Sequence, residues 1–496
     1  MKIEKTFTNQ LNINYRAIIK ILGAIIFIVG IAMIIPWVYA ELTHNSFDAA
    51  AFRKSAPPSI IVGAFLMFHF KSTDAKFRTR DGYFVVALCW IVASFIGAFP
   101  YYFSTFTSSF VDAFFESASG FTTTGCTAVA NGVLSNSLLL WKALSHWLGG
   151  MGILIFVLSI LPALGVNGQF IARAEAPGIV FEKMAVRLSD STRVLYTTYI
   201  ALTVAEYIFL VVSPKVGWFD ALVNSMGSIS TGGLLVHPEG VSYYDSFYIE
   251  IVISIFCILA SINFMLYNHI RSGHIRNVLK DVELRAFLII IAGGIIISTL
   301  VLIQYSNESL YDAFRDSFFQ IISMATTTGY VRSPYTIWPV TCQMILLMLM
   351  FIGGCGGSTS GSIKVIRIVV MLKLIVRGSY KRIHPRSVVP IRVGEQVIPA
   401  PVVSGISGFI MTYLAIFLAS SIILGIQGLD METTMGTALA MLSNTGAAFG
   451  VSTAAGCFAV YSPGLKLFLC LLMFIGRLEI FTMLVMFTRQ FWGKSR

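Results

Sequence analysis

The chain has 496 residues, of which 56% are hydrophobic and only 12% are charged. About a quarter of the residues in an ordinary soluble domain are charged, so the composition excludes a soluble protein of the usual kind. The apolar runs at 18–39 and 287–303 are long enough to cross a lipid bilayer. The sequence therefore predicts an all-α polytopic membrane protein.

The net charge of +11 does not indicate a nucleic-acid partner, because the basic residues are segregated. Most of the lysines and arginines lie in alternate connections between apolar runs, which is typical of loops on the cytoplasmic side of a membrane. We expect these connections, and both chain termini, to be cytoplasmic. The connections are the N-terminus, 71–82, 163–193, 269–285, 364–392 and 489–496.

The seven cysteines form no Cys-x-x-Cys pair and mostly lie within apolar runs. We interpret them as small core residues rather than as disulfide partners or metal ligands. The sequence also contains no clear metal-ligand spacing and no nucleophile–base pair. We therefore expect neither an enzyme nor an organic cofactor.

A short Thr-Gly element occurs four times, each time between two apolar runs. A single copy would be interpreted as a turn, but four copies in one membrane chain predict re-entrant segments around one axis. Glycine permits backbone angles that point successive carbonyls the same way, and rings of carbonyl oxygens can replace the hydration shell of a cation. The pivotal glycines are Gly125, Gly232, Gly329 and Gly446. The expected ion-binding residues are Thr123, Thr124, Gly125, Ser230, Thr231, Gly232, Thr327, Thr328, Gly329, Asn444, Thr445 and Gly446.

Each element follows a short apolar segment that begins near an acidic residue, such as Asp112 or Asp220. An acid suits a helix N-terminus. Helices this short cannot span a membrane, but they suit re-entrant pore helices whose negative C-terminal ends favour a cation. We predict pore helices at 110–119, 218–228, 310–325 and 429–442.

One spanning helix precedes each pore helix, and another follows each Thr-Gly element. Two spans per unit keep all units in the same orientation, unlike the inverted repeats of many transporters. The predicted fold is two N-terminal transmembrane helices followed by four parallel helix–pore loop–helix repeats around a pseudo-fourfold pore. The expected boundaries are 1–80 for the N-terminal extension and 81–165, 190–275, 282–380 and 398–496 for the repeats. The predicted spans are 15–40, 58–70, 83–103, 136–162, 192–212, 244–269, 284–305, 336–376, 401–426 and 463–491. Of these, 58–70 is short for a span, so it begins earlier or tilts little.

The last span of the third repeat, 336–376, is about twice as long as a bilayer requires. Its middle, 353–364, contains glycines and hydroxyl residues that do not form a stable helix interior. We predict a helix, a loop at membrane depth and a second helix. A phosphate-binding loop is not favoured, because the Gly-Lys-Ser/Thr ending is missing and no strand is expected before it.

A gate below the filter is the favoured role for this loop, because its excess length exceeds what helix packing needs. Close helix packing is instead preferred for the small residues Gly149 to Gly152. The expected gate residues are Gly353, Gly354, Gly356, Gly357, Ser358, Thr359, Gly361 and Arg477.

Arg477 is the strongly basic residue that we place near the middle of a span. An arginine there costs roughly 2.5–3.5 kcal/mol, so it should face a partner or water. One hypothesis is that it holds the loop by bonding carbonyls and repels cations when exposed, and we favour it. The other is that Glu479 or Glu206 neutralises it and it only fixes helix packing. Residues two apart do not face each other on a helix, which weakens the Glu479 version. Glu206 and Glu116 are interpreted as buried hydrogen-bonding anchors rather than ion ligands.

Together, these motifs resemble the TrkH/KtrB family of potassium transporters over nearly the whole chain. The two helices before the first repeat make the chain more similar to the TrkH type than to the shorter KtrB type. The resemblance rests on the four Thr-Gly elements, Gly149 to Ile153 with Leu161 and Pro162, Arg173 to Gly178, Gly353 to Lys364, and Gly476 with Arg477.

The resemblance implies a K⁺ uptake subunit of the bacterial inner membrane, built as a homodimer with one pore per protomer. It also implies a TrkA- or KtrA-like cytoplasmic nucleotide-binding ring that opens and closes the 353–364 loop, with Arg477 contacting that loop. K⁺ is then the transported ion, and glycine at all four pivotal positions favours K⁺ over Na⁺. The second and fourth copies, at Ser230 and Asn444, depart from Thr-Thr-Gly, which implies displaced carbonyls and looser selectivity.

The alternative function is K⁺/H⁺ or K⁺/Na⁺ symport by the same fold. A broken-helix transporter of an organic solute is disfavoured by four parallel repeats. We expect no soluble regulatory domain in this chain, because 376–400 is too short for a nucleotide-binding fold. A basic inner surface would dock either a separate sensor chain or anionic lipid, and both remain open. Its residues are Arg377, Lys381, Arg382, Arg386 and Arg392.

Overall fold

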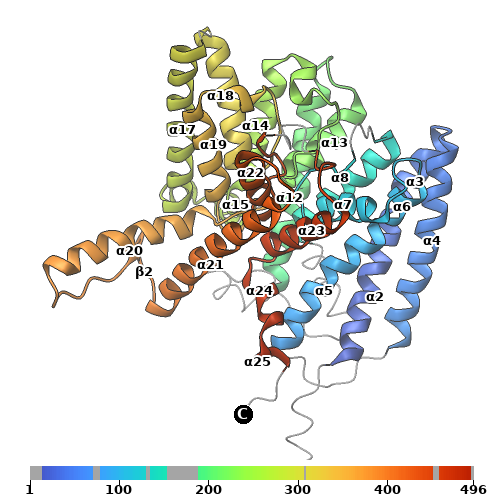
Figure 1. The fold of residues 1–496 in the computed structure, drawn as a ribbon, viewed down its shortest axis with the longest axis horizontal. Helices are drawn as coiled ribbons and strands as arrows, with labels where there is room; N and C mark the ends of the chain where they lie inside the picture. The colour runs from blue at the N-terminus through green and yellow to red at the C-terminus, as the bar shows by residue number, and fades with distance from the viewer. Residues whose placement is uncertain are drawn as a thin grey trace, which may run out of the picture.

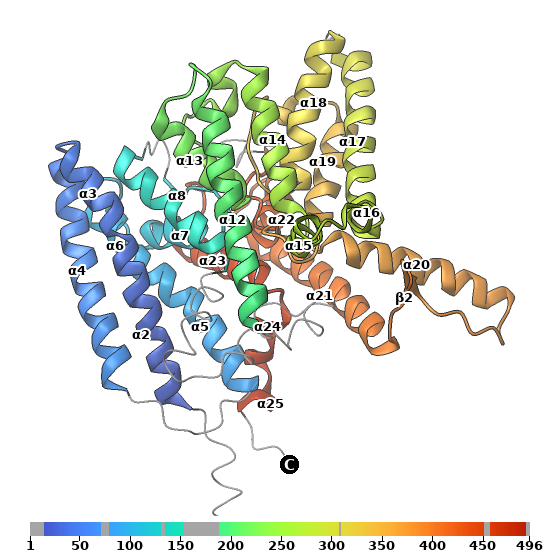
Figure 2. The ribbon, with the colours of Figure 1, turned by 180° about the vertical axis from the view of Figure 1, so that it is seen from behind.

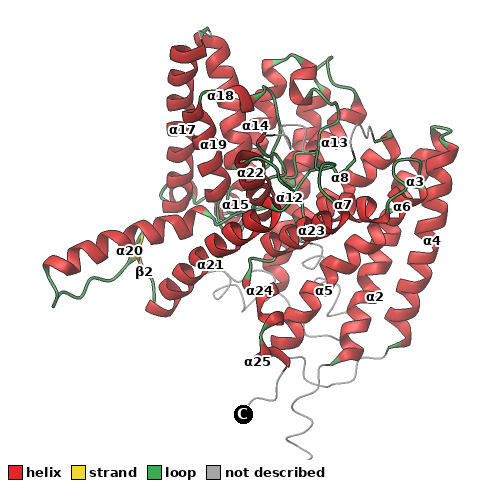
Figure 3. Ribbon diagram, in the orientation of Figure 1, coloured by secondary structure: helices red, strands yellow, loops and turns green. Residues whose placement is uncertain are grey.

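The computed structural model describes residues 14–70, 79–129, 134–152, 188–306, 309–450 and 457–492. Helices make up most of this part of the chain (Figure 3). The expected all-α class is confirmed, with one small addition, an antiparallel hairpin of β1 (Arg392–Val393) and β2 (Gln396–Val397). The motifs at Leu161–Pro162 and Arg173–Gly178 lie outside the described residues.

Among the described residues, five helices are long and apolar enough to cross a membrane, or up to seven if each of two bent pairs counts as one span. Figures 1 and 2 show α2 and α4 at one side of the molecule and α17, α18 and α19 at another. In both views α20 and α21 extend away from the bundle.

The N-terminal extension consists of α2 (Tyr15–Ala32), α3 (Ile34–Leu42) and α4 (Ser46–His69). Of the two alternatives for the short span 58–70, the earlier start is confirmed, because α4 begins at Ser46 and contains Pro57 and Pro58 in its interior. Its true start is marked by Asn45, whose side chain accepts a hydrogen bond from Asp48 N. An Asn cap is a strong helix start, and the proline pair concealed it.

Glycines bring α2 and α4 into close contact. A Cβ added to Gly63 would lie 2.4 Å from Phe27 N, and one added to Gly30 would lie 2.9 Å from Ile60 N. Small residues let helix backbones approach closely, which is the main source of helix association in membranes.

The four repeats follow the same helix order. The first contains α5 (Thr79–Gly97), α6 (Phe99–Phe103), the pore helix α7 (Phe110–Phe121) and α8 (Asn136–Gly150). The second contains α12 (Leu188–Val211), the pore helix α13 (Trp218–Ile229), η2 (Gly240–Tyr244), α14 (Phe247–Ser261), α15 (Phe264–Arg271) and α16 (Ile275–Leu279). The third contains α17 (Val282–Ser306), the pore helix α18 (Leu310–Ala325), η3 (Tyr335–Ile337), α19 (Val340–Ile352) and α20 (Val365–Ile383). The fourth contains α21 (Ala400–Gly425), the pore helix α22 (Met431–Leu442), α23 (Pro463–Arg477), α24 (Phe481–Leu484), η5 (Val485–Phe487) and α25 (Arg489–Trp492).

The pore helices begin with the capping chemistry that their sequences predict. Ser109 and Ser309 accept hydrogen bonds from the N–H groups of Asp112 and Asp312. Asp430 caps α22 through Thr433 N at 2.9 Å. These side chains satisfy helix N–H groups that otherwise have no partner.

In the first, second and fourth repeats, the helix that follows the Thr-Gly element ends earlier than predicted, at Gly150, Ser261 and Arg477. The predicted continuous helices 244–269 and 463–491 are wrong: α14 and α15 meet at 95°, and the α23 segment meets the following one at 115°. Extended backbone at Ile262 breaks the first pair, and positive φ values at Glu479 and Ile480 break the second. The predicted interruption after Ile352 is confirmed, since α19 ends there and α20 begins only at Val365.

Candidate ion pathway

Each pore helix ends in the same way. One residue with left-handed backbone follows the helix cap, and the next residue donates its N–H to a carbonyl five positions back, which is a Schellman cap. The left-handed residues are Thr123 (φ 56°), Thr231 (53°), Thr327 (56°) and Asn444 (55°). The capping bonds run from Thr124 N to Ser119 O (2.9 Å), Gly232 N to Gly227 O (2.8 Å), Thr328 N to Ser323 O (2.9 Å) and Thr445 N to Ala440 O (3.0 Å). The repeated cap makes the four elements structurally equivalent.

Threonine is an unusual residue for left-handed backbone, because its branched side chain is strained there. Strain of this kind persists where the surrounding structure needs the conformation, often at functional sites. Three threonines in this conformation therefore mark the ends of the pore helices as the candidate site.

The structure corrects the register of the second element. A glycine with positive φ lies two residues after each left-handed residue, and in the second element that glycine is Gly233, not Gly232. Gly232 instead occupies the position of Thr124. The sequence Ser230-Thr231-Gly232-Gly233 offers two adjacent glycines, and spacing alone did not distinguish them. The corrected glycines are Gly125 (φ 80°), Gly233 (57°), Gly329 (78°) and Gly446 (73°).

These four glycines join the elements into a closed ring of backbone contacts. A Cβ added to any of them would collide with a carbonyl oxygen of the next element. The distances would be 2.0 Å from Gly125 to Gly232 O, 1.9 Å from Gly233 to Thr328 O, 1.9 Å from Gly329 to Thr445 O and 1.8 Å from Gly446 to Thr124 O. Because the fourth element returns to the first, the predicted filter residues encircle one axis, and only glycine fits at the points of contact.

A buried ion pair supports the first element from behind. Lys142 Nζ lies 2.7 Å from Glu116 Oε2 and donates to Cys126 O at 2.8 Å, and both side chains are almost fully buried. Glu116 also accepts from Ala128 N at 2.9 Å. The pair therefore fixes the chain just after the filter, and Glu116 acts as an anchor, as we interpreted it from the sequence.

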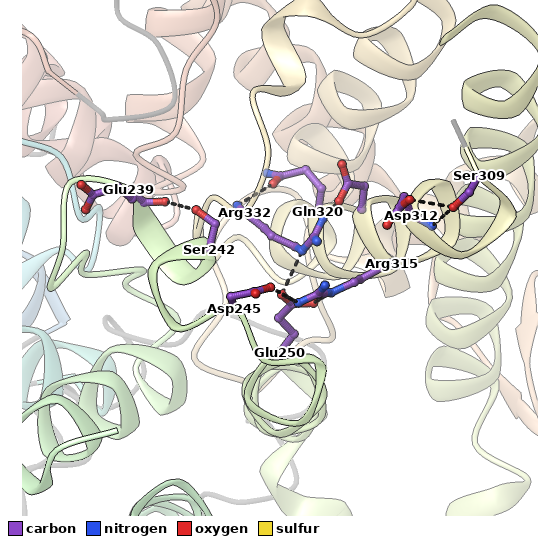
Figure 4. A network of polar contacts seen from close by, with 10 residues as sticks. Glu239, Ser242, Asp245, Glu250, Ser309, Asp312, Arg315, Gln320 and Arg332 are labelled. Atoms are coloured by element: carbon purple, nitrogen blue, oxygen red, sulfur yellow. Dashed lines mark hydrogen bonds and ion pairs between the residues drawn. The ribbon is translucent and has the colours of Figure 1, made fainter. Parts of the chain in front are cut away.

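A second charged cluster supports the third element on its outer side. Figure 4 shows Arg315 and Arg332 converging on Glu250 of α14. Arg332 lies three residues after Gly329, and its backbone N–H donates to Gln320 Oε1 at 3.4 Å. Gln320 in turn donates to Tyr330 O at 3.3 Å. The segment that follows the third filter element is thus tied to its own pore helix and to α14.

The 353–364 loop lies against the third and fourth Thr-Gly elements. Gly361 N donates to Thr327 Oγ1 at 2.7 Å, and a Cβ on Gly361 would lie 2.0 Å from Ser443 O. The last carbonyls of α14 accept hydrogen bonds from the loop: Ser261 O from Cys355 N at 2.9 Å and Ala260 O from Thr359 Oγ1 at 3.0 Å. The loop therefore contacts the third and fourth filter elements and the helix that follows the second.

Glycines shape this loop, and Glu283 holds its two ends. Gly353 and Gly357 have positive φ values of 71° and 72°. A Cβ on Gly354 would lie 2.4 Å from Ser360 Oγ, so the loop folds tightly on itself. Glu283 Oε1 accepts from Gly356 N at 2.7 Å and from Ile366 N at 3.0 Å. Of the other predicted gate residues, Ser358 Oγ donates to Cys355 O at 2.6 Å.

Arg477, the last residue of α23, links the filter, the loop and α8. Its Nη1 donates to Thr123 Oγ1 at 3.2 Å and to Thr359 O at 3.1 Å. Its Nη2 donates to Gly149 O at 2.5 Å and to Gly150 O at 2.9 Å. Carbonyls at a helix C-terminus are suitable partners for a cation. The expected bond between Arg477 and a loop carbonyl is present, and the Glu479 carboxylate contacts Arg367.

Close packing by Gly149 and Gly150, which we preferred from the sequence, is also present. A Cβ on Gly149 would lie 1.8 Å from Phe121 O, and one on Gly150 would lie 2.8 Å from Ser230 Cα. The end of α8 therefore packs directly against the ends of the first two pore helices.

A search of known families gives a match over most of the chain. The TrkH family, described as a cation transport protein, matches residues 48–494. The chain belongs to the TrkH family.

Curated relatives and a solved structure agree with this assignment. The Trk system potassium uptake protein TrkH of Salmonella typhimurium (strain LT2) is 34% identical over 484 residues, covering 97% of this chain and 99% of that protein. The Trk system potassium uptake protein TrkG of Escherichia coli (strain K12) is 30% identical over 481 residues, covering 96% and 98%. The crystal structure of the potassium transporter TrkH from Vibrio parahaemolyticus superposes with a TM-score of 0.86 at 31% identity, covering 97% of this chain and all of that one. The TrkH-family chain is thus a membrane transport protein and not an enzyme.

A cavity of about 1080 Å³ lies beside the loop in this TrkH-family chain. Its lining includes Gly356 to Thr359 and also Asn277, Lys280 and Arg285, which belong to a connection that we predict to be cytoplasmic. The loop therefore lies between the filter and this cavity.

Reasoning from the sequence located the four Thr-Gly elements and the 353–364 loop of the TrkH-family chain but missed the charged groups that contact them. These are Lys142, Glu250, Glu283, Arg315, Arg332 and Arg367. A usable signal existed for Lys142, which lies among the apolar residues 138–144. A lysine within a span requires an acidic partner, so Lys142 pairs with Glu116.

Proposed function

We propose that this chain is a K⁺ uptake protein, and that dehydrated K⁺ passes through the ring formed by the four Thr-Gly elements. The observation that carries the proposal is the closure of that ring by backbone contacts at Gly125, Gly233, Gly329 and Gly446. Rings of backbone carbonyls replace water around K⁺ in selective pores. The names of the relatives, potassium uptake proteins, support the choice of ion.

The pathway is proposed to be channel-like and driven by the membrane potential, which is worth roughly 2.3 kcal/mol per charge per 100 mV. The four pore helices support it, because their negative C-terminal ends all point to the ring and favour a cation there. The ion-binding role of the predicted filter residues and the boundaries of the four repeats are part of this proposal.

The 353–364 loop is proposed to be the gate, and Arg477 is proposed to hold it closed. Its support is the pair of bonds that join the loop to the filter, Gly361 to Thr327 and Arg477 to Thr359. The loop has few apolar side chains and is rich in glycine, so it can move at low cost. Movement towards the inner cavity would open the pathway.

Regulation is proposed to come from a separate cytoplasmic nucleotide-binding ring that acts on a homodimer in the bacterial inner membrane, with both termini inside. Support for a docking site comes from the exposed or half-buried basic residues of a connection that we predict to be cytoplasmic, namely Arg377, Lys381, Arg382, Arg386 and Arg392. Anionic lipid would contact the same residues, and titration with the ring or with anionic vesicles separates the two.

The test is ion uptake by liposomes that contain the purified chain. Rb⁺, a K⁺ substitute, should enter well ahead of Na⁺ and Li⁺, and equal uptake of Na⁺ would contradict the selectivity. Deletion of 356–359 should raise basal Rb⁺ uptake, because it removes the part of the loop that faces the inner cavity. Unchanged uptake after the deletion would contradict the gate.

Coupled K⁺/H⁺ or K⁺/Na⁺ symport is the second candidate. Glu206, a fully buried carboxyl group in α12, is the proton site that it would use. Symport predicts uphill K⁺ accumulation that collapses when the pH gradient is removed at fixed potential, and Glu206→Gln should abolish it. A channel predicts that neither change alters Rb⁺ uptake at fixed potential.

A further inference from the structure

The second filter element lacks a side chain that the other three share. Thr124, Thr328 and Thr445 lie directly after the left-handed residue, whereas the second element has Gly232 there. Each of the three threonine hydroxyls shares a hydrogen bond with the hydroxyl of its helix cap. The pairs are Thr122 with Thr124 (2.8 Å), Thr326 with Thr328 (2.8 Å) and Ser443 with Thr445 (2.7 Å). The corresponding cap of the second element, Ser230, donates to Gly227 O at 3.1 Å instead.

Backbone geometry does not require glycine at position 232. The positive φ values in this element belong to Thr231 and Gly233, and the equivalent positions elsewhere hold threonine. Space is the reason for glycine. A Cβ added to Gly232 would lie 2.1 Å from His146 Nδ1 and 2.9 Å from His146 Cε1. The imidazole of His146, in α8 of the first repeat, therefore occupies the volume that a threonine side chain fills in the other elements.

His146 is completely buried, and its ring also faces the end of the first pore helix. A Cβ on Gly120 would lie 3.9 Å from His146 Cδ2. Neither ring nitrogen has a hydrogen-bond partner among the described residues. A buried polar group without a partner costs free energy, so its presence needs an explanation. The close fit of the His146 ring against the backbone of Gly232 supplies this explanation.

We propose that His146 is a specificity-determining residue of the ion pathway. Its ring replaces the missing fourth threonine and fixes the position of the second element, and so the spacing of that element's carbonyls around the ion. This inference rests on the proposed K⁺ pathway. Selectivity depends on carbonyl geometry, and two adjacent glycines give the second element the most freedom to depart from it.

The experiment compares Rb⁺ and Na⁺ uptake by liposomes containing the wild type, His146→Ala, Gly232→Thr or both substitutions together. In His146→Ala the Rb⁺/Na⁺ uptake ratio should fall roughly fivefold while Rb⁺ uptake persists, because the second element loses the contact that positions it. Gly232→Thr should lose most Rb⁺ uptake, because its side chain collides with the ring. The double variant should recover Rb⁺ uptake and most of the ratio, because the new hydroxyl can then pair with Ser230.

Two controls separate this role from a general effect on folding. Gly408→Thr places the same side chain where no atom lies within 4 Å of the added Cβ, and it should leave uptake unchanged. Size-exclusion profiles in detergent show whether each variant remains folded. His146→Gln keeps a polar side chain of similar size and replaces the alanine variant in the test if that variant does not fold. Its Rb⁺/Na⁺ ratio should stay nearer the wild type than the ratio of a variant with a smaller side chain.

Two outcomes would overturn the role of His146. One is an unchanged Rb⁺/Na⁺ ratio in a folded His146→Ala protein, including the case in which both uptakes fall by the same factor, and the other is a double variant no better than Gly232→Thr. Each of these presupposes selective Rb⁺ uptake by the wild type. Absence of Rb⁺ uptake by wild-type vesicles would instead contradict the proposed function itself.

Discussion

The first and third filter elements are each anchored by a serine of their own pore helix, whereas the second has no such serine and packs against side chains of its neighbours. In the first, Ser119 Oγ donates to Cys126 O at 2.8 Å, and in the third, Ser323 Oγ donates to Tyr330 O at 2.7 Å. The second element has Gly227 at the equivalent position. A Cβ there would lie 2.6 Å from the Tyr330 hydroxyl, which belongs to the third element.

The second element thus has glycine at both positions where the first and third have hydroxyl residues, and a neighbouring side chain occupies each space. Tyr330 fills the space at Gly227 and donates to Asn224 O at 3.1 Å, while His146 fills the space at Gly232. A ring with near-fourfold backbone geometry is therefore built from unequal parts. Its symmetry lies in the helix caps, and its differences lie in the side chains behind them.

The largest effect should come from breaking a contact that both kinds of element share. Gly446→Ala places a Cβ 1.8 Å from Thr124 O, and a backbone carbonyl cannot yield to it. A displacement of about 1 Å at such a site can cost about a hundredfold in rate, so we expect Rb⁺ uptake by liposomes to fall by about that factor. The control is Gly408→Ala in α21, where the added Cβ meets nothing within 4 Å. Normal uptake by Gly446→Ala would contradict the closed ring.

The ion pair behind the first element has no counterpart at Asn224 in the second. Lys142→Ala leaves the buried Glu116 carboxylate without its cation, which typically costs about 3–5 kcal/mol. The melting temperature in detergent, followed by tryptophan fluorescence, should fall clearly. The double variant Lys142→Met with Glu116→Gln removes both charges and should be much nearer the wild type. Equal losses in the single and double variants would show that the charge is not the cause.

The packing of Tyr330 against the second element can be broken and then relieved. Gly227→Ala forces a Cβ against the Tyr330 hydroxyl, and overpacking of this kind costs about 1–3 kcal/mol. Tyr330→Phe removes the oxygen in the way, so Gly227→Ala should be less harmful in that background. Melting temperatures of the four proteins give the coupling between the two sites. Additive effects would mean that the hydroxyl does not fill the space at Gly227.

The serine anchors of the first and third elements should make smaller contributions. Ser119→Ala and Ser323→Ala each remove one buried hydrogen bond, worth about 0.5–1.5 kcal/mol, and should lower the Rb⁺/Na⁺ ratio modestly. Ser421→Ala removes a similar bond, from its hydroxyl to Phe417 O at 2.9 Å in α21, far in sequence from any filter element. It should change stability without changing the ratio, and a matching loss of selectivity there would remove the special role of the anchors.

The smallest effect should come from the cap of the fourth pore helix, which is acidic where the first and third caps are serines. Hydrogen bonds from the Thr433 side chain and backbone lower the pKa of Asp430. The cap's contribution is therefore complete above the usual aspartate pKa of about 3.9 and is lost as pH falls through the lowered pKa. Asp430→Ala should cost about 0.5 kcal/mol near neutral pH, and the difference from wild type should vanish in acid. The loss in Ser109→Ala, whose hydroxyl accepts from Asp112 N, should not depend on pH.

The sequence was sufficient to predict the fold class, the four pore helices and the interruption at 353–364. Those features depend on local signals: long apolar runs, acidic or hydroxyl caps, and glycines that cannot continue a helix. The exact start of α4 was not predicted, because Pro57 and Pro58 gave a stronger local signal than the Asn45 cap.

The features that the sequence did not reveal depend on contacts between distant segments. The choice between Gly232 and Gly233 depends on His146, which lies 86 and 87 positions earlier in the chain. The bend at Ile262 is stabilised by Cys355 N bonding Ser261 O, a partner from another repeat. Local patterns contain no information about such partners.

Thr327 connects the third filter element to the 353–364 loop through one hydrogen bond. Its backbone shapes the third filter element, and its hydroxyl accepts the N–H of Gly361 in the loop. Displacement of the loop breaks this hydrogen bond and leaves the Thr327 hydroxyl without it. Distortion of the third element likewise displaces the acceptor of the loop's N–H. The proposed filter and gate therefore share one contact, and we expect a substitution made to alter ion preference to alter open probability as well.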